Sequence, residues 1–127
     1  MGEAPHERLE IYRTSLEAAR SLREIARGLD REEEDLRDQL QRAATSVVLN
    51  LAEGAGEYRP AEKARFYRMS RRSAAECLAV LDLIAVYGLD AGNREPSRGM
   101  LRQIMATLTR LIHAVESRAQ PQPQRQP

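Results

Sequence analysis

The sequence has few of the residues on which disulfide-bonded, metal-bound or membrane-embedded proteins depend. It contains no Trp, one Phe and one Cys in 127 residues. The single cysteine, Cys77, excludes an intramolecular disulfide and removes the usual basis for a cysteine-ligated zinc site. No apolar run approaches the roughly 20 residues of a membrane-spanning helix, and residues 1–5 do not lead into the apolar region of a signal peptide. We therefore expect a soluble protein of the reducing cytoplasm, with no membrane as a partner.

An excess of charge of one sign is also missing. The chain has 20 Lys and Arg residues against 19 Asp and Glu residues, which gives a formal net charge of +1. The chain as a whole therefore attracts neither nucleic acid nor anionic lipid. Any such binding must come from a local cluster of one sign.

What the sequence does have is a helix-forming composition, with 42% apolar and 31% charged residues in a length that suits one domain. Apolar residues recur every three or four positions, which predicts helices over about residues 7–28, 31–53, 60–87 and 97–118. Four such helices joined by short turns predict an all-α fold, an antiparallel up-down-up-down four-helix bundle over residues 1–119. The Pro- and Gln-rich tail at 120–127 is predicted to be disordered.

Local signals mark the ends of these segments. The segment Gly54-Ala55-Gly56 predicts the end of the second helix, after about Glu53, and Gly88 predicts the end of the third. Asp30 followed by Glu33 predicts a capping box at the start of the second helix. Pro60 suits the first turn of the third helix, where its missing N–H costs nothing.

Side chains capable of catalysis are few and scattered. His6 lies near the N-terminus and His113 on the polar side of the last helix, and neither has a cysteine or carboxylate at ligand spacing on the same face. The predicted core stripe of the third helix consists of Phe66, Ser70, Ser73, Cys77, Leu81 and Ile84. A free cysteine on such a stripe usually serves as a small apolar residue. We therefore expect no metal site, no cofactor and no enzymatic activity.

The third helix begins with a basic segment. Residues 59–72 contain six basic residues and one acid. On a helical wheel the face opposite Phe66 and Cys77 carries Arg65, Arg68 and Arg72. Such a face can bind phosphates in a salt-dependent and sequence-independent way; the alternative is a solvated face whose arginines pair with acids elsewhere. The candidate contacts, here called the arginine ridge, are Arg65, Arg68, Arg71 and Arg72.

The same helix ends in an apolar segment. Between Cys77 and Tyr87 only Asp82 is charged, and Leu83 and Val86 lie outside the core stripe. A helix that is apolar almost all round is buried on more than one side. Leu83 and Val86 are therefore the predicted interface of a homo-oligomer.

The second helix carries a sequence that resembles a known family. Residues 39–47 lead to Asn50-Leu51-Ala52-Glu53-Gly54, as a Leu-Arg-Arg-Ala segment leads to Asn-Ile-Ala-Glu-Gly in that family. It comprises small bacterial four-helix-bundle proteins encoded in intervening sequences of large-subunit ribosomal RNA genes, relatives of the accessory variability determinant of diversity-generating retroelements. Lys63 departs from the pattern, which commonly has an aromatic residue there. Further positions that match the family's spacing are Gly56, Glu62, Phe66, Ser73 and Glu76.

The resemblance implies a non-enzymatic homopentamer with a nucleic-acid context. The residues themselves predict structural roles for the shared motif. Asn50 lies on the core side of the second helix, so its amide should bond groups near the Gly54 turn, because buried polar groups are satisfied. Glu53 and Glu76 are expected to pair with Arg42 or other basic residues.

Two functions remain open at this point. In the first, the oligomer associates with RNA or DNA through the arginine ridge. In the second, it is a protein-interaction scaffold that docks a partner such as a reverse transcriptase, with the same ridge as docking surface.

Overall fold

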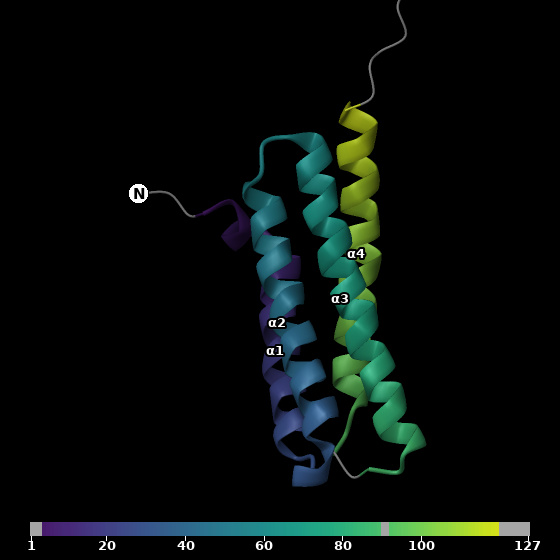
Figure 1. The fold of residues 1–127 in the computed structure, drawn as a ribbon. Coiled ribbons are helices and arrows are strands. Elements are labelled where there is room, and N and C mark those ends of the chain that lie inside the picture. Colours follow the sequence, from purple (N-terminus) through teal and green to yellow (C-terminus); the bar gives the residue numbers. More distant parts are fainter. Residues whose placement is uncertain (1–3, 90–91, 120–127) are drawn as a thin grey trace, which may run out of the picture.

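The computed structural model describes residues 4–89 and 92–119, and every regular element within these ranges is helical. Figure 1 shows four long helices that run side by side. They are α1 (Glu10–Arg27), α2 (Glu34–Gly56), α3 (Pro60–Val86) and α4 (Glu95–Ala119), with short 3-10 turns η1 (Pro5–Arg8) and η2 (Arg31–Glu33). The predicted tail at 120–127 lies outside the described residues.

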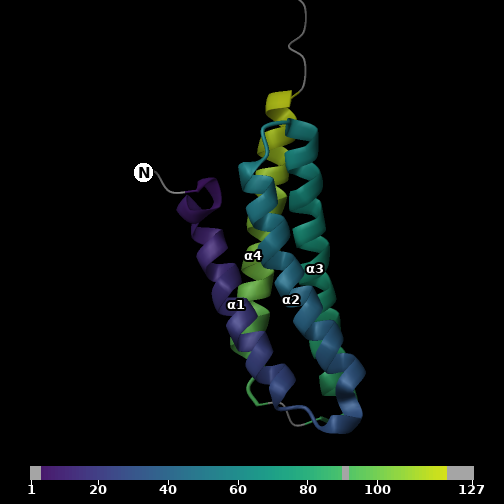
Figure 2. The same ribbon diagram turned by 60° about the vertical axis from the view of Figure 1, so that its left-hand side comes forward.

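The four helices form the predicted up-down-up-down arrangement. Within the described ranges α1 packs against α2 and α4, and α3 packs against α2 and α4, whereas the diagonal pairs make no such contact. Figure 2 shows consecutive helices connected at alternate ends of the bundle. The prediction of an all-α four-helix bundle is therefore confirmed. None of the described helices combines the length and apolar character that crossing a bilayer requires.

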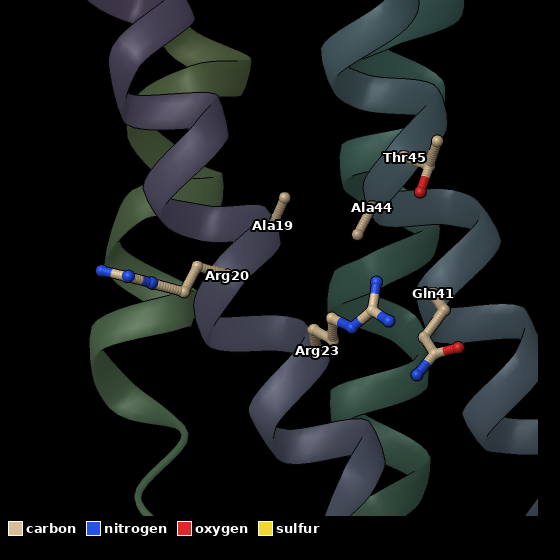
Figure 3. A pocket seen from close by; sticks show the side chains of 6 residues that line it. All are labelled: Ala19, Arg20, Arg23, Gln41, Ala44 and Thr45. Carbon is tan, nitrogen blue, oxygen red and sulfur yellow. The ribbon is translucent and has the colours of Figure 1, made fainter.

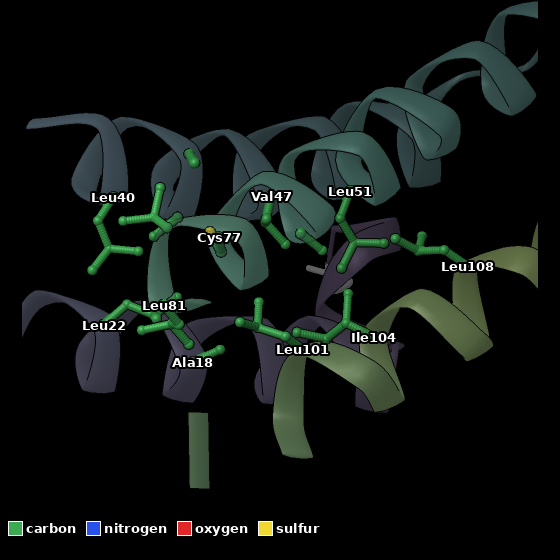
Figure 4. Close-up of a cluster of buried hydrophobic side chains, with 14 of the residues drawn as sticks. Ala18, Leu22, Leu40, Val47, Leu51, Cys77, Leu81, Leu101, Ile104 and Leu108 are labelled. Atoms are coloured by element: carbon green, nitrogen blue, oxygen red, sulfur yellow. The ribbon is translucent and has the colours of Figure 1, made fainter. Parts of the chain in front are cut away.

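Each helix contributes a stripe of apolar side chains to one central core (Figure 4). Burial of each large aliphatic side chain stabilises the fold by about 1.5–3 kcal/mol. Cys77 is fully buried among them, as predicted, and burial raises the pKa of its thiol to about 12. The largest fully buried side chains include Leu22, Leu40, Leu51, Leu81, Ile84, Leu101, Ile104 and Leu108.

The start of α2 differs from the prediction. Asp30 forms no side-chain cap, so the capping box with Glu33 is absent. The Glu33 N–H instead donates to the Asp30 carbonyl at 2.9 Å, and the chain makes a 3-10 turn before α2 begins. The turn satisfies this amide through the backbone, which leaves the two carboxylates to solvent.

The end of α2 also differs, because the helix continues through the glycines to Gly56. Gly54 is buried, and a Cβ atom built on it would lie 2.7 Å from the Tyr67 ring. The Lys63 ammonium donates to the carbonyls of Gly54 (2.7 Å) and Ala55 (3.0 Å). Gly54 therefore allows close packing on α3 rather than ending the helix, and Lys63 satisfies carbonyls of the last turn.

The core side of α3 is rotated relative to the prediction near its start. Tyr67 is buried and Phe66 only half-buried, although Phe66 was placed on the core stripe. The difference arises because the space left by Gly54 accepts the Tyr67 ring. At the other end Gly88 has a φ of +67° and follows the last turn of α3, which confirms the predicted stop.

Candidate nucleic-acid interface

The first arginine of the ridge is held by its own helix. The Arg65 guanidinium donates to the Glu62 carboxylate, with a closest N–O distance of 2.9 Å. This hydrogen bond raises the pKa of Arg65 and lowers that of Glu62. The guanidinium also lies over the Phe66 ring, 4.7 Å from its centroid. Arg65 and Phe66 are therefore neighbours, which corrects the prediction that they occupy opposite faces of the helix.

The next two arginines reach from α3 to α4. Arg68 forms an exposed ion pair with Glu116, and the Arg71 guanidinium donates to the Thr109 hydroxyl at 3.1 Å. Arg72 is exposed and has no hydrogen bond or ion pair with any described residue. Half of the ridge is thus paired with acids, and Arg71 and Arg72 keep uncompensated charge.

The solvated-face interpretation accounts for only part of the ridge, and the phosphate-binding interpretation stays a prediction. Arg65 and Arg68 behave as solvated arginines paired with acids, whereas Arg71 and Arg72 do not. An exposed ion pair contributes only about 0–1 kcal/mol, so exchange of a carboxylate for a phosphate costs little. The ridge can therefore present all four guanidinium groups to a polyanion.

The apolar end of α3 is open on the single chain. The side chains of Leu83, Val86 and Tyr87 are 38%, 79% and 59% exposed. Asp82 on the same turn is paired with Arg98 of α4 at 2.8 Å. Leu83 and Val86 thus lie together on the surface, at the place predicted to be an oligomer interface. Arg98 partly neutralises the charge of Asp82 on the same turn.

The pairing predicted for the shared motif is not found: Asn50 bonds to another residue, and Glu53 and Glu76 form no ion pair within the described ranges. The Asn50 amide donates to the Ser46 carbonyl (3.0 Å) and hydroxyl (2.9 Å), one helical turn back, and not to the Gly54 turn. Glu53 and Glu76 are exposed, and within the described residues neither forms an ion pair with Arg42. Arg42 and Glu76 do line the same shallow groove between α2 and α3.

Serine hydroxyls join α2 to α3, which sequence reasoning missed. The buried Ser70 hydroxyl donates to the Val47 carbonyl at 2.7 Å, and Ser73 donates to the Ser46 hydroxyl at 2.8 Å. A signal was present, since serines at 70 and 73 lie on the predicted core stripe, where buried hydroxyls need partners. The shared motif thus belongs to the packing of α2 on α3.

A second hollow lies between α1 and α2. Its volume is about 180 Å³, and the small side chains of Ala19 and Ala44 leave the space open. Figure 3 shows Arg23 reaching toward Gln41 across the hollow, whereas Arg20 points away from it. The Arg23 guanidinium is turned into the hollow, and no buried charge lies at its base. The hollow is therefore a gap between two packed helices rather than a pocket for a cofactor.

The histidines do not assemble a reactive site. His6 packs edge-on against Tyr12 with ring centroids 4.6 Å apart, and His113 is exposed on α4. Among the residues that the structure describes, no three His, Cys, Asp or Glu side chains are grouped so that they could hold a metal ion.

The fold and its surface define a class of protein: a small four-helix bundle with a serine-bonded α2–α3 pair, a cationic face and an open apolar helix end. Residues 7–110 match the family described as 23S rRNA-intervening sequence protein. Because this match covers most of the chain, the protein belongs to that family, as its resemblance predicted. No curated protein matches the chain.

Proposed function

We propose that this protein is a non-enzymatic homo-oligomer that associates with nucleic acid in the cytoplasm through the arginine ridge. The observation that carries the proposal is the uncompensated charge of Arg71 and Arg72 beside two arginines held only by exposed acids. Arginine binds phosphate through planar, multiple N–H donors. A family defined by ribosomal RNA genes supports the nucleic-acid context.

The non-enzymatic part of the proposal rests on the state of the reactive groups. The one thiol, Cys77, is buried with a pKa near 12, so almost none of it is thiolate at neutral pH. The thiol is therefore not a candidate nucleophile, which supports the proposal that the protein is not an enzyme.

The experiment is a binding titration of labelled RNA at two salt concentrations. Replacing Arg71 and Arg72 together by Ala should weaken binding to all sequences alike and lower the salt slope by about two, because each lost phosphate contact removes about one unit. The matched control replaces Arg13 and Arg20, two exposed arginines of α1, and should bind as the wild type does. Wild-type protein that binds no nucleic acid at low salt would refute the proposal.

The open apolar end of α3 favours a second candidate, a scaffold that docks a partner protein. Leu83, Val86 and Tyr87 are exposed together at one end of the helix, and contiguous apolar surface of this kind marks interaction sites. Affinity capture from the native host, with and without nuclease, separates the two functions. A protein partner that stays bound after nuclease treatment would favour the scaffold, and one lost with the RNA would favour nucleic-acid association.

A further inference from the structure

The turn between α2 and α3 presents an aromatic ring to solvent. Tyr58 is 96% exposed, the largest exposed fraction among the large apolar side chains described. Single exposed apolar residues are common, so exposure alone assigns no role. The surroundings of this ring are what distinguish it.

The backbone under the ring is fixed. One oxygen of the Glu57 carboxylate accepts the N–H groups of Tyr58 (3.1 Å) and Arg59 (3.2 Å). Pro60 follows directly as the first residue of α3, where its ring restricts φ. The turn therefore fixes the backbone from which the Tyr58 ring projects before any ligand arrives, which lowers the entropic cost of binding.

A hollow of about 220 Å³ lies beside the ring, lined by Tyr58, Pro60, Lys63, Val115 and Arg118. It is smaller than the roughly 300–1,000 Å³ of sites for drug-sized ligands, so it suits a single ring and not a whole cofactor. Figure 1 shows why these segments meet: the α2–α3 turn lies at the same end of the bundle as the last turns of α4.

The rim of the hollow is cationic. Arg59, Lys63 and Arg118 form no ion pair with any described residue. Burial and the charge of Arg118 lower the pKa of Lys63, so the two cations lie close enough to repel each other. Of the nearby acids, Glu62 is paired with Arg65, whereas Glu57 keeps its charge and partly offsets the effect of Arg118 on the pKa of Lys63. An added anion would relieve this repulsion.

We propose that this end of the bundle is a binding site for single-stranded nucleic acid, in which an unpaired base stacks on Tyr58 and the flanking phosphates contact Arg59, Lys63 and Arg118. A rigid aromatic face beside cations is the arrangement by which proteins bind single strands without reading sequence. A duplex keeps its bases stacked inside and cannot use the ring. An acidic peptide would use the cations but not the ring.

This site rests on the proposed association with nucleic acid and specifies its form. Arg65, the first arginine of the ridge, follows Arg59 by six residues, about 9 Å along the axis of α3. One bound strand is long enough to reach both Tyr58 and the ridge. Single strands should therefore engage the ring and the ridge together, whereas duplexes engage the ridge alone.

The test compares Tyr58→Ala, Tyr58→Phe and wild type in fluorescence anisotropy titrations with oligouridylate, oligodeoxyuridylate and a duplex of the same length. We expect Tyr58→Ala to weaken binding of single strands by roughly five- to a hundredfold, the loss of one stacked base, and to leave duplex binding unchanged. Tyr58→Phe should bind single strands nearly as the wild type does, because its ring still stacks. Whichever of the two single strands binds more tightly identifies RNA or DNA as the source.

Two outcomes would overturn the inference. Equal single-strand affinity of Tyr58→Ala and wild type would show that no base stacks there, and an equal loss for strand and duplex would show that the ring does not select unpaired bases. Either result leaves the ridge proposal standing, provided that the Arg71 and Arg72 variant still loses affinity for the duplex. Wild-type protein that binds neither strand nor duplex would refute both.

Discussion

Gly54 lies where α2 passes against the Tyr67 ring of α3. A methyl group added there would approach two ring carbons to 2.7 Å and the Phe66 Cβ to 3.2 Å. The ring is buried and cannot move away without opening the core. Gly56, two residues on in the same helix, has no atom within 4 Å of the position a Cβ would take. Both glycines therefore lie in the same helix, but only Gly56 has room for a side chain.

This pair gives a matched prediction. Gly54→Ala should lower the free energy of unfolding by about 1–3 kcal/mol, because overpacking outweighs the better helix propensity of Ala. Gly56→Ala should raise it by about 0.5–1 kcal/mol, since only propensity changes. Urea denaturation followed by circular dichroism measures both. A stabilised Gly54→Ala variant would contradict the close approach described here.

At the scale of elements, the contact of α2 with α3 is the most extensive in the bundle. Its centre is made of small side chains, with Ser70 fully buried and bonded to the Val47 carbonyl. Small residues at such a contact let two helices approach closely, and no space remains for a longer side chain.

Ser70→Leu should therefore destabilise the protein by about 1–3 kcal/mol or more, because an enlarged side chain at a packed contact forces the helices apart. Ser117→Leu makes the same change at an exposed position of α4 and should stay within about 0.5 kcal/mol of wild type. Thermal unfolding of both variants tests the difference. Equal melting temperatures for the two would show that α2 and α3 do not depend on this close contact.

The helices could be predicted from the sequence because their apolar period is a local property. The contacts that join the helices could not be predicted in this way. Ser73 bonds to Ser46 across 27 positions and Arg68 pairs with Glu116 across 48, so these partners become visible only when the helices are docked. The exchange of Phe66 for Tyr67 in the core has the same origin, since a wheel drawn for α3 alone does not contain Gly54.

The candidate interface was predictable in composition but not in charge. The sequence identifies the four arginines of the ridge and the acid three residues from Arg65, yet the acid that neutralises Arg68 lies on α4, 48 positions away. Tyr58 was not singled out, because a lone tyrosine in a turn carries no signal until the hollow beside it and the cations of α3 and α4 are in place.

At the scale of the whole molecule, the exposed end of α3 supports a prediction of self-association. Leu83 and Val86 lie on the surface of the single chain, where burial against a second copy would remove apolar area from water. The family resemblance implies five subunits. We therefore expect the intact particle to have a mass of about five chains.

Light scattering after size-exclusion chromatography should show that Leu83→Glu combined with Val86→Glu reduces the particle to the 14.4 kDa of one chain. Both positions are exposed, so the helical content should not change. Leu16→Glu, at an exposed leucine of α1, serves as the control and should keep the wild-type mass. A wild-type protein that elutes as a single chain at tens of micromolar, about the concentration at which a specific interface forms, would refute self-association.

The serine hydrogen bonds between α2 and α3 also affect how rigid the proposed binding surface is. They join α2 to α3. The turn between these two helices holds Tyr58, and α3 carries every arginine of the ridge. The backbone positions of Tyr58 and of the ridge arginines are thus fixed relative to one another. If a single strand binds as proposed, the strand has to adapt its shape to the protein, because the helix pair does not adapt to the strand.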